Sequence, residues 1–261
     1  MDALVFKLQG KMAHFRKYYS NSTALSYHIP PVTTIKGILA GLLGYERDSY
    51  YKMFANDQCR IGIAVDYPLK KITQTMNLMK IERPSELPGK GVHTQNHTEW
   101  VVPYNIRTGI VSYTIVVTHK QEDIMQQLQE RICTLSLGYQ SAGISVALGS
   151  AQCQGWISEG RKICLEEKTA GEDAVLSRFA VPVSYIQKVE PYQNTFCVKK
   201  EETITEFDEN RYLTEGSKIN ILLSADGTPL SYVWKPGVIY WSYEKENLIL
   251  LGDEKHVVGS L

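Results

Sequence analysis

Residues 1–44 read MDALVFKLQG KMAHFRKYYS NSTALSYHIP PVTTIKGILA GLLG. Leu4, Phe6 and Leu8 fall at every second position, which is the period of a β-strand, and Gly10 marks the turn that ends it. The two prolines at 30 and 31 keep the chain extended before a helix that ends at Gly44. One face of that helix carries Ile35, Ile38, Leu39, Leu42 and Leu43. The segment therefore predicts a strand, a long loop and a buried helix.

The charges of this segment point to an anion. No Asp or Glu lies between Asp2 and Glu46, and the basic residues there are Lys7, Lys11, Arg16, Lys17 and Lys36. Thr33 or Thr34 is predicted to cap the helix, and Lys36 in the first turn opposes the helix dipole unless an anion lies nearby. A cationic loop that leads into a helix N-terminus can hold a phosphate chain. The alternative is an ordinary loop whose basic side chains are simply solvated.

The same residues carry a family resemblance. FKLQG at 6–10, FRK at 15–17 and PPVTTIKGILAGLLG at 30–44 together resemble the N-terminal signature of the fifth Cas family. This is the RAMP-superfamily subunit that caps the 5′ handle of crRNA in type I CRISPR Cascade complexes, and the segment is most similar to the type I-B branch. LGSAQ at 148–152 resembles the family's second glycine-centred turn, although Gln152 and Cys153 stand where relatives commonly carry an acidic residue and an aromatic one.

The resemblance implies a non-catalytic RNA-binding subunit. The loop and the helix start would hold the RNA backbone, aromatic side chains such as Phe15, Tyr18 and Tyr19 could stack bases, and residues 81–99 would form the family's thumb hairpin. The implied partners are the crRNA 5′ handle, the backbone and large subunits of Cascade and, indirectly, target DNA near the PAM. The expected RNA-binding residues are Gly10, Lys11, His14, Phe15, Arg16, Lys17, Tyr18, Thr33, Thr34, Lys36, Arg83, Lys90 and His93.

The rest of the chain predicts an α+β fold. Strands are expected at 59–65, 71–80, 100–104, 111–118 and 152–157, and helices at 49–55 and 121–133. This order indicates a ferredoxin-like or RRM (βαββαβ) domain over residues 1–160, with the thumb inserted at about 81–99. A charged linker is expected at 162–173, followed by a small β-rich domain at 175–261 with strands at 178–186, 218–223, 230–234, 238–243 and 248–251.

Composition sets further bounds on the class of protein. Residues 1–120 hold 15 Lys and Arg against eight Asp and Glu, and the remainder holds 13 against 20, so a basic half precedes an acidic half. That asymmetry is expected when one side of a protein contacts nucleic acid. No apolar run is long enough for a membrane span, and no secretory signal is evident. Five widely spaced cysteines indicate reduced thiols in a cytoplasmic protein.

Two further pairs of residues are candidate sites. His93 and His97 have the spacing of metal ligands, but their segment is polar and not helical, so we expect neither a metal nor a cofactor. His119 and Lys120 could act as general base and electrostatic stabiliser in metal-independent RNA cleavage. A crRNA-processing endoribonuclease is therefore the alternative hypothesis, because one branch of the family cleaves its own repeat RNA.

Overall fold

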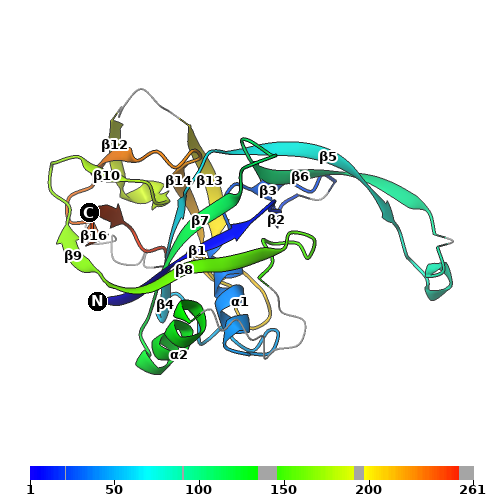
Figure 1. The fold of residues 1–261 in the computed structure, drawn as a ribbon, viewed down its shortest axis with the longest axis horizontal. Coiled ribbons are helices and arrows are strands. Elements are labelled where there is room, and N and C mark those ends of the chain that lie inside the picture. Colours follow the sequence, from blue (N-terminus) through cyan, green and yellow to red (C-terminus); the bar gives the residue numbers. More distant parts are fainter. Residues whose placement is uncertain (21, 90, 135–145, 191–196, 253–261) are drawn as a thin grey trace.

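The structure, a computed structural model, describes residues 1–20, 22–89, 91–134, 146–190 and 197–252. Its centre is a four-stranded sheet with the order β4-β7-β1-β8, in which all neighbours are antiparallel (Figure 1). The strands are β1 Asp2–Gly10, β4 Cys59–Val65, β7 Val111–His119 and β8 Gly155–Cys164. Along the chain, helix α1 (Val32–Leu42) separates β1 from β4, and α2 (Glu122–Cys133) separates β7 from β8.

Both faces of this sheet are buried. Leu4, Phe6 and Leu8 of β1 belong to the hydrophobic cluster that includes the apolar faces of α1 and α2. Ala3 and Val5, which point the other way, pack with Phe179 and other residues of the C-terminal strands. The predicted alternation of β1 is therefore confirmed. Successive side chains contact the helices on one face of the sheet and the C-terminal strands on the other. Each such burial of a large apolar side chain contributes about 1.5–3 kcal/mol.

Helix α1 has the predicted buried face but begins differently. Its cap is Pro31, in an extended conformation, and no side chain caps the helix. The Thr34 N–H donates to the Pro31 carbonyl at 2.9 Å, so the prediction of a threonine cap is wrong. Beyond the C-terminus, Gly44 has a φ of 82°, the left-handed conformation that glycine adopts without strain. In α2 the buried residues are Ile124, Leu128 and Ile132, as predicted.

A long hairpin leaves the body of the molecule between β4 and β7 (Figure 1). Its strands, β5 (Leu69–Met79) and β6 (His93–Pro103), pair without interruption from Leu69↔Pro103 to Met79↔His93. A short 3₁₀ turn, η1 (Pro84–Glu86), lies at the tip. Residues 93–99, predicted as part of the thumb hairpin and not as part of the returning strand at 100–104, belong to β6. Their polarity concealed the strand because most of this ribbon is solvated and needs no apolar alternation.

The N-terminal loop packs against the base of this hairpin. Its two short strands, β2 (Phe15–Arg16) and β3 (Ser26–Tyr27), pair with each other. Ala13 forms a bridge with Val101 of β6, and Ala24 forms one with Thr98. The loop and the hairpin base therefore form one continuous layer.

The C-terminal region consists of three small sheets with the orders β10-β15-β12, β11-β14-β13 and β17-β16-β9. Two predictions are wrong, one for the segment that leads into this region and one for residues 49–55. The charged segment 162–173 is no linker, because β8 continues to Cys164 and β9 pairs with β16. Residues 49–55 form turns in place of a helix. The elements here are β9 Glu166–Thr169, β10 Val175–Ser177, β11 Val181–Pro182, η2 Val183–Tyr185, β12 Ile186–Glu190, β13 Val198–Ile204, β14 Lys218–Ser224, β15 Leu230–Trp234, β16 Ile239–Tyr243 and β17 Glu246–Leu248.

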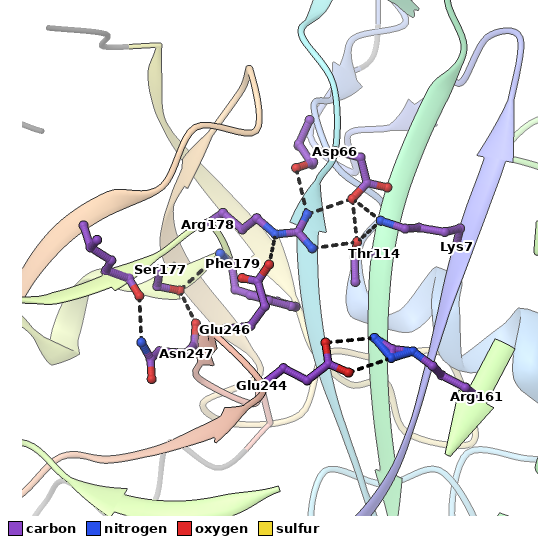
Figure 2. A network of polar contacts seen from close by, with 12 residues as sticks. Lys7, Asp66, Thr114, Arg161, Ser177, Arg178, Phe179, Glu244, Glu246 and Asn247 are labelled. Atoms are coloured by element: carbon purple, nitrogen blue, oxygen red, sulfur yellow. Dashed lines mark hydrogen bonds and ion pairs between the residues drawn. The ribbon is translucent and has the colours of Figure 1, made fainter. Parts of the chain in front are cut away.

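A polar network fastens the C-terminal region to the central sheet (Figure 2). The Arg178 guanidinium donates to Asp66 and to Glu246, each at 2.8 Å, and the Lys7 ammonium reaches the same Asp66 oxygen at 2.7 Å. Burial opposes the ionisation of Asp66, but the donors around it, including the Thr114 hydroxyl, outweigh burial and lower the pKa of this carboxyl. The network thus joins β1, β7, the end of β4 and the C-terminal strands through one buried carboxylate.

Two kinds of feature are absent from the described residues. No helix within them combines the length and the apolar composition that a membrane span requires. Within the same residues, no group of three or more His, Cys, Asp or Glu side chains is arranged to hold a metal ion.

Candidate nucleic-acid interface

Four segments meet around one cavity of about 430 Å³, which we call the hairpin groove. They are the loop after β1, the N-terminus of α1, one face of the β5–β6 hairpin and the turn that precedes β8. The lining residues are His14, Phe15, Arg16, Ala24, Pro31, Thr34, Met76, Leu78, Asn96, Thr98, Trp100, Gly149, Ser150 and Gln152. Four predicted RNA-binding residues are brought together here, namely His14, Phe15, Arg16 and Thr34.

Glycines hold the loop against the turn at residues 148–152. The His14 N–H donates to the Leu148 carbonyl at 3.0 Å. Gly149 has a φ of 90°, and a Cβ on it would clash with the His14 carbonyl oxygen. At Gly10 a Cβ would lie 2.5 Å from a methyl group of Leu148. Both glycines therefore serve the close approach of two backbone segments.

His14 and Phe15 form the wall of the groove from the protein side. The Nδ1 atom of His14 donates to the Glu99 carbonyl at 2.6 Å, because a carbonyl can only accept, and the ring lies 5.4 Å from that of Trp100. Phe15 is only 2 % exposed and packs edge-on against Tyr113 in the core. Phe15 therefore belongs mainly to the core, and its stacking with a base stays a prediction.

Lys36 is a correction to the expected cation at the helix start. The residue is 4 % exposed, and its ammonium donates to Asn56 Oδ1 at 2.7 Å and to the Thr205 carbonyl at 3.0 Å. A cation in the first turn of a helix is unfavourable unless negative charge lies nearby, and the sequence predicted that an RNA phosphate supplies it. In the structure, two oxygens of the protein stabilise the Lys36 ammonium, one of them from the C-terminal region. With Thr33, Lys36 lines a separate cavity of about 340 Å³ and does not reach the hairpin groove.

Strand β13 neutralises part of the basic loop. The Lys17 ammonium lies 3.7 Å from a Glu201 carboxylate oxygen, and the Tyr18 hydroxyl donates to Glu202 at 2.7 Å. Lys11 and Arg16 are exposed, and the Arg16 guanidinium donates to the Ser20 carbonyl at 3.2 Å. Arg16 and Lys11 are therefore the loop cations best placed to meet a phosphate.

The remaining predicted RNA contacts lie away from the groove. Arg83 and His93 are exposed on the hairpin, Arg83 at its tip and His93 at the start of β6. Lys90 lies outside the described residues. The structure thus separates the predicted contacts into those at the groove and those along the projecting hairpin.

The alternative catalytic pair lies at the opposite end of β7 from the hairpin. The His119 ring accepts the Gln121 N–H at Nδ1 (3.0 Å), which leaves Nε2 to donate to the Met53 carbonyl at 2.8 Å. Burial lowers the pKa of this imidazole, so it is neutral at pH 7. Lys120 beside it is exposed. Because both ring nitrogens of His119 are engaged, the side chain has no lone pair with which to deprotonate a 2′-hydroxyl.

Comparison with known proteins identifies the segment that builds the groove. Residues 3–103 match the family model described as CRISPR-associated protein (Cas_Cas5). The chain thus resembles the Cas5 family of CRISPR-associated proteins over a segment that spans less than half of its length. The matched segment supplies three of the four walls of the groove, and only the turn at residues 148–152 lies outside it.

Solved structures resemble this protein at low sequence identity. A crystal structure of a CRISPR protein from Archaeoglobus fulgidus shares its fold, with a TM-score of 0.61 at 12% sequence identity, over 96% of this chain and 99% of that chain. A chain of a CRISPR RNA-guided surveillance complex is more distant, with a TM-score of 0.47 at 12% identity, over 89% of this chain and 91% of that chain. A search of curated proteins finds no match.

One wall of the groove was not predicted from the sequence. Asn96, Thr98 and Trp100 alternate along β6 and point to the same side, opposite the even-numbered positions of β5. The two-residue spacing was a usable signal, but Asn96 and Thr98 fell within the predicted thumb hairpin at 81–99, outside the strand that was expected at 100–104. Pairing with β5 turns that segment into a strand and aligns the three side chains.

Proposed function

We propose that this protein is an RNA-binding subunit of a type I CRISPR Cascade surveillance complex, and that it holds the 5′ handle of crRNA in the hairpin groove. The observation that carries the proposal is the groove itself. The segments that resemble the family signature, far apart in sequence, line one cavity together with the hairpin. The type I-B subtype remains a prediction.

The topology supports RNA as the ligand. The chain order β1, α1, β4, β7, α2, β8 with the sheet order β4-β7-β1-β8 is that of a ferredoxin-like or RRM unit. Such units bind single-stranded RNA in many proteins, although the fold alone hosts other functions as well. We interpret residues 1–160 as this unit and residues 175–261 as an added β-rich domain.

The electrostatics of the groove suit a phosphate chain at its rim. Arg16 lines the cavity, Lys11 lies exposed in the same loop, and the N-terminus of α1 opens toward it through Pro31 and Thr34. Exposed cations and a helix N-terminus both favour anions. The interior of the groove is less polar, with Met76 and Leu78 on the hairpin side.

The hairpin supports a contact with neighbouring subunits. Apolar side chains are exposed along its outer half, with Leu87 63 % exposed and Val92 74 % exposed. Exposed apolar groups in one projecting element are typical of a protein–protein contact. We infer that the hairpin is the thumb and lies against a backbone subunit, that the large subunit is the other neighbour, and that target DNA near the PAM is met indirectly.

A binding role is favoured over the alternative of a metal-independent endoribonuclease. The hydrogen bonds of His119 occupy both of its ring nitrogens, and neither His119 nor Lys120 lines the groove. We therefore propose that the protein is not a nuclease.

The test uses the purified protein and the repeat RNA of its own CRISPR locus. Fluorescence anisotropy should show tighter binding of crRNA with an intact 5′ handle than of the same RNA without it. A denaturing gel should show the repeat RNA uncut, with or without chelator. Equal affinity for both RNAs would overturn handle binding, and single-site cleavage that His119→Ala abolishes would favour the nuclease.

A further inference from the structure

One loop cation that we expect at the RNA is held by an acid of the protein. The Lys17 ammonium lies 3.7 Å from a Glu201 carboxylate oxygen on β13. Beside this pair, the Tyr18 hydroxyl donates to Glu202 at 2.7 Å. Lys17 and Tyr18 directly follow Arg16, which lines the hairpin groove. Two carboxylates of the C-terminal region therefore occupy the part of the loop where we expect a phosphate chain.

Contacts other than Lys17 fix Glu201 in place. Its side chain is only 7 % exposed, and one carboxylate oxygen accepts the His28 N–H at 2.7 Å. The other oxygen lies 3.2 Å from the Lys71 ammonium, which also donates to the Ser26 carbonyl. These contacts do not involve Lys17, so they hold the carboxylate beside the loop when Lys17 moves away. Glu201 is therefore a preorganised competitor for any anion that approaches Lys17.

Lys17 is held less firmly than Glu201. Its separation of 3.7 Å from the carboxylate oxygen exceeds the roughly 2.7–2.9 Å of a charge-assisted hydrogen bond. The ammonium also lies over the rings of Tyr19 and Tyr27, 5.7 Å and 5.4 Å from their centroids. Tyr19 is 49 % exposed, so this end of the loop is accessible from solvent. A phosphate that makes a direct hydrogen bond can thus replace the carboxylate as the partner of Lys17.

We propose that Glu201 is an autoinhibitory residue of the RNA-binding loop, which competes with RNA phosphates for the Lys17 ammonium. The inference rests on the proposed RNA-binding function and adds to it a regulation of the same site. An RNA phosphate must break the ion pair and then lie near a carboxylate of like charge, so the loop binds any RNA more weakly than its basic sequence predicts. An RNA that only the loop holds is then released easily, whereas an RNA that the groove holds as well stays bound.

The experiment releases Lys17 and measures the affinity for RNA. The probes are crRNA with an intact 5′ handle and the same RNA without it, titrated by fluorescence anisotropy. Glu201→Gln keeps an acceptor for the His28 N–H and removes the charge that attracts Lys17. We expect it to bind the crRNA about threefold more tightly at low salt. The line of log affinity against log salt should steepen by up to about 0.7, because one more phosphate is neutralised. A purely structural role of Glu201 predicts weaker binding instead.

The matched control is the same substitution in a protein without Lys17. In a Lys17→Ala background, Glu201→Gln should change neither the affinity nor the slope, because the cation that it releases is absent. Glu190→Gln removes the charge of a partly exposed carboxylate on β12 that lies 3.0 Å from the Lys188 ammonium, and it should also leave both unchanged. A gain in affinity of equal size with and without Lys17 would show a general effect of charge and overturn the proposal.

Urea unfolding checks that each variant folds. If Glu201→Gln does not fold, Glu201→Asp takes its place in the same design, since it keeps the charge beside Lys71 and draws it back from Lys17 by one methylene group. Unchanged or weaker RNA binding by a folded variant would overturn the autoinhibitory contact while leaving handle binding intact. Equal affinity of the wild type for the RNAs with and without the handle would instead overturn the proposed function.

Discussion

Two sets of basic residues occupy this protein, and they differ in what neutralises them. Lys7, Lys36 and Arg178 lie inside and meet oxygens of the protein, whereas Lys11 and Arg16 stand at the surface beside the groove. All but Arg178 belong to the same acid-free stretch of sequence. The distribution of charge along the sequence therefore does not distinguish a cation that stabilises the fold from one that can bind a ligand. The burial of each side chain in the structure does distinguish them.

The acids of the second half of the chain explain part of this division. Glu201 lies near Lys17 and Lys71 and also accepts the His28 N–H at 2.7 Å. The basic first half and the acidic second half thus neutralise each other in part within the protein. The overall asymmetry overstates the charge that remains for nucleic acid.

Removing an interior cation should have the largest effect. Arg178→Ala removes one ion-pair partner from Asp66, which keeps Lys7, and from the partly exposed Glu246, so we expect a loss of about 1.5–3 kcal/mol in the free energy of unfolding. The control is Arg161→Ala in the same view of Figure 2, where the exposed pair with Glu244 should contribute less than about 1 kcal/mol. Urea unfolding measures both, and equal losses would contradict the distinction between the two sets.

Acidification should destabilise the same network by protonating the Asp66 carboxylate. The donors around Asp66 hold its pKa below the ordinary value, so its contribution is present above a pH of about 4 and is lost as the pH falls through the lowered pKa. Asp66→Asn should reduce stability by about 2 kcal/mol at pH 7, with a difference from the wild type that shrinks below pH 4. Thermal unfolding of both proteins at several pH values measures this difference. If it stays constant from pH 7 to pH 2, the charge of Asp66 is not the stabilising feature.

Removing the surface cations should leave the fold intact and change RNA binding. For Lys11→Ala with Arg16→Ala, we expect unchanged urea unfolding and weaker binding of handle RNA. The line of log affinity against log salt should flatten by about 0.7 for each RNA phosphate that the variant no longer neutralises. Lys188→Ala, an exposed residue whose ammonium lies 3.0 Å from Glu190 on β12, is the control. An unaltered slope in the double variant would remove the loop from the interface.

The smallest effect on RNA binding is expected at His119. His119→Ala breaks two hydrogen bonds outside the groove and should cost about 1 kcal/mol of stability with no change in the affinity for handle RNA. Anisotropy titrations of variant and wild type should superimpose. A loss of affinity larger than threefold would place His119 closer to the RNA than the structure does.

Local patterns predicted the elements that are apolar along one face. Cys59–Val65 and Leu230–Trp234 were predicted to the residue, and the buried positions of α2 were correct. Strand β13, which reads VKKEETI, was missed because four charged residues in a row show no apolar alternation, although Glu201 among them is buried. Sequence likewise could not show that Lys36 is buried, since its partners come from residues 56 and 205.

The candidate site was predicted in its parts but not in its assembly. The loop, the helix start and the second glycine turn were each recognised in the sequence. Their contact in the folded protein could not be predicted, because residue spacing does not show which distant segments pack together. Phe15 and Lys36 were expected at the RNA and lie in the interior. Trp100 was expected in a strand but not at the site, because only the pairing of β6 with β5 shows which way its ring points.

The uninterrupted pairing of β5 with β6 has a consequence for how this protein is made in the cell. Toward the tip, the described hairpin residues pair only with each other, so both outer edges carry backbone N–H and C=O groups that another strand can join. Copies synthesised in excess of their partners meet one another first, and such edges favour self-association. We therefore expect the isolated protein to self-associate through the edges of the hairpin unless another chain covers them.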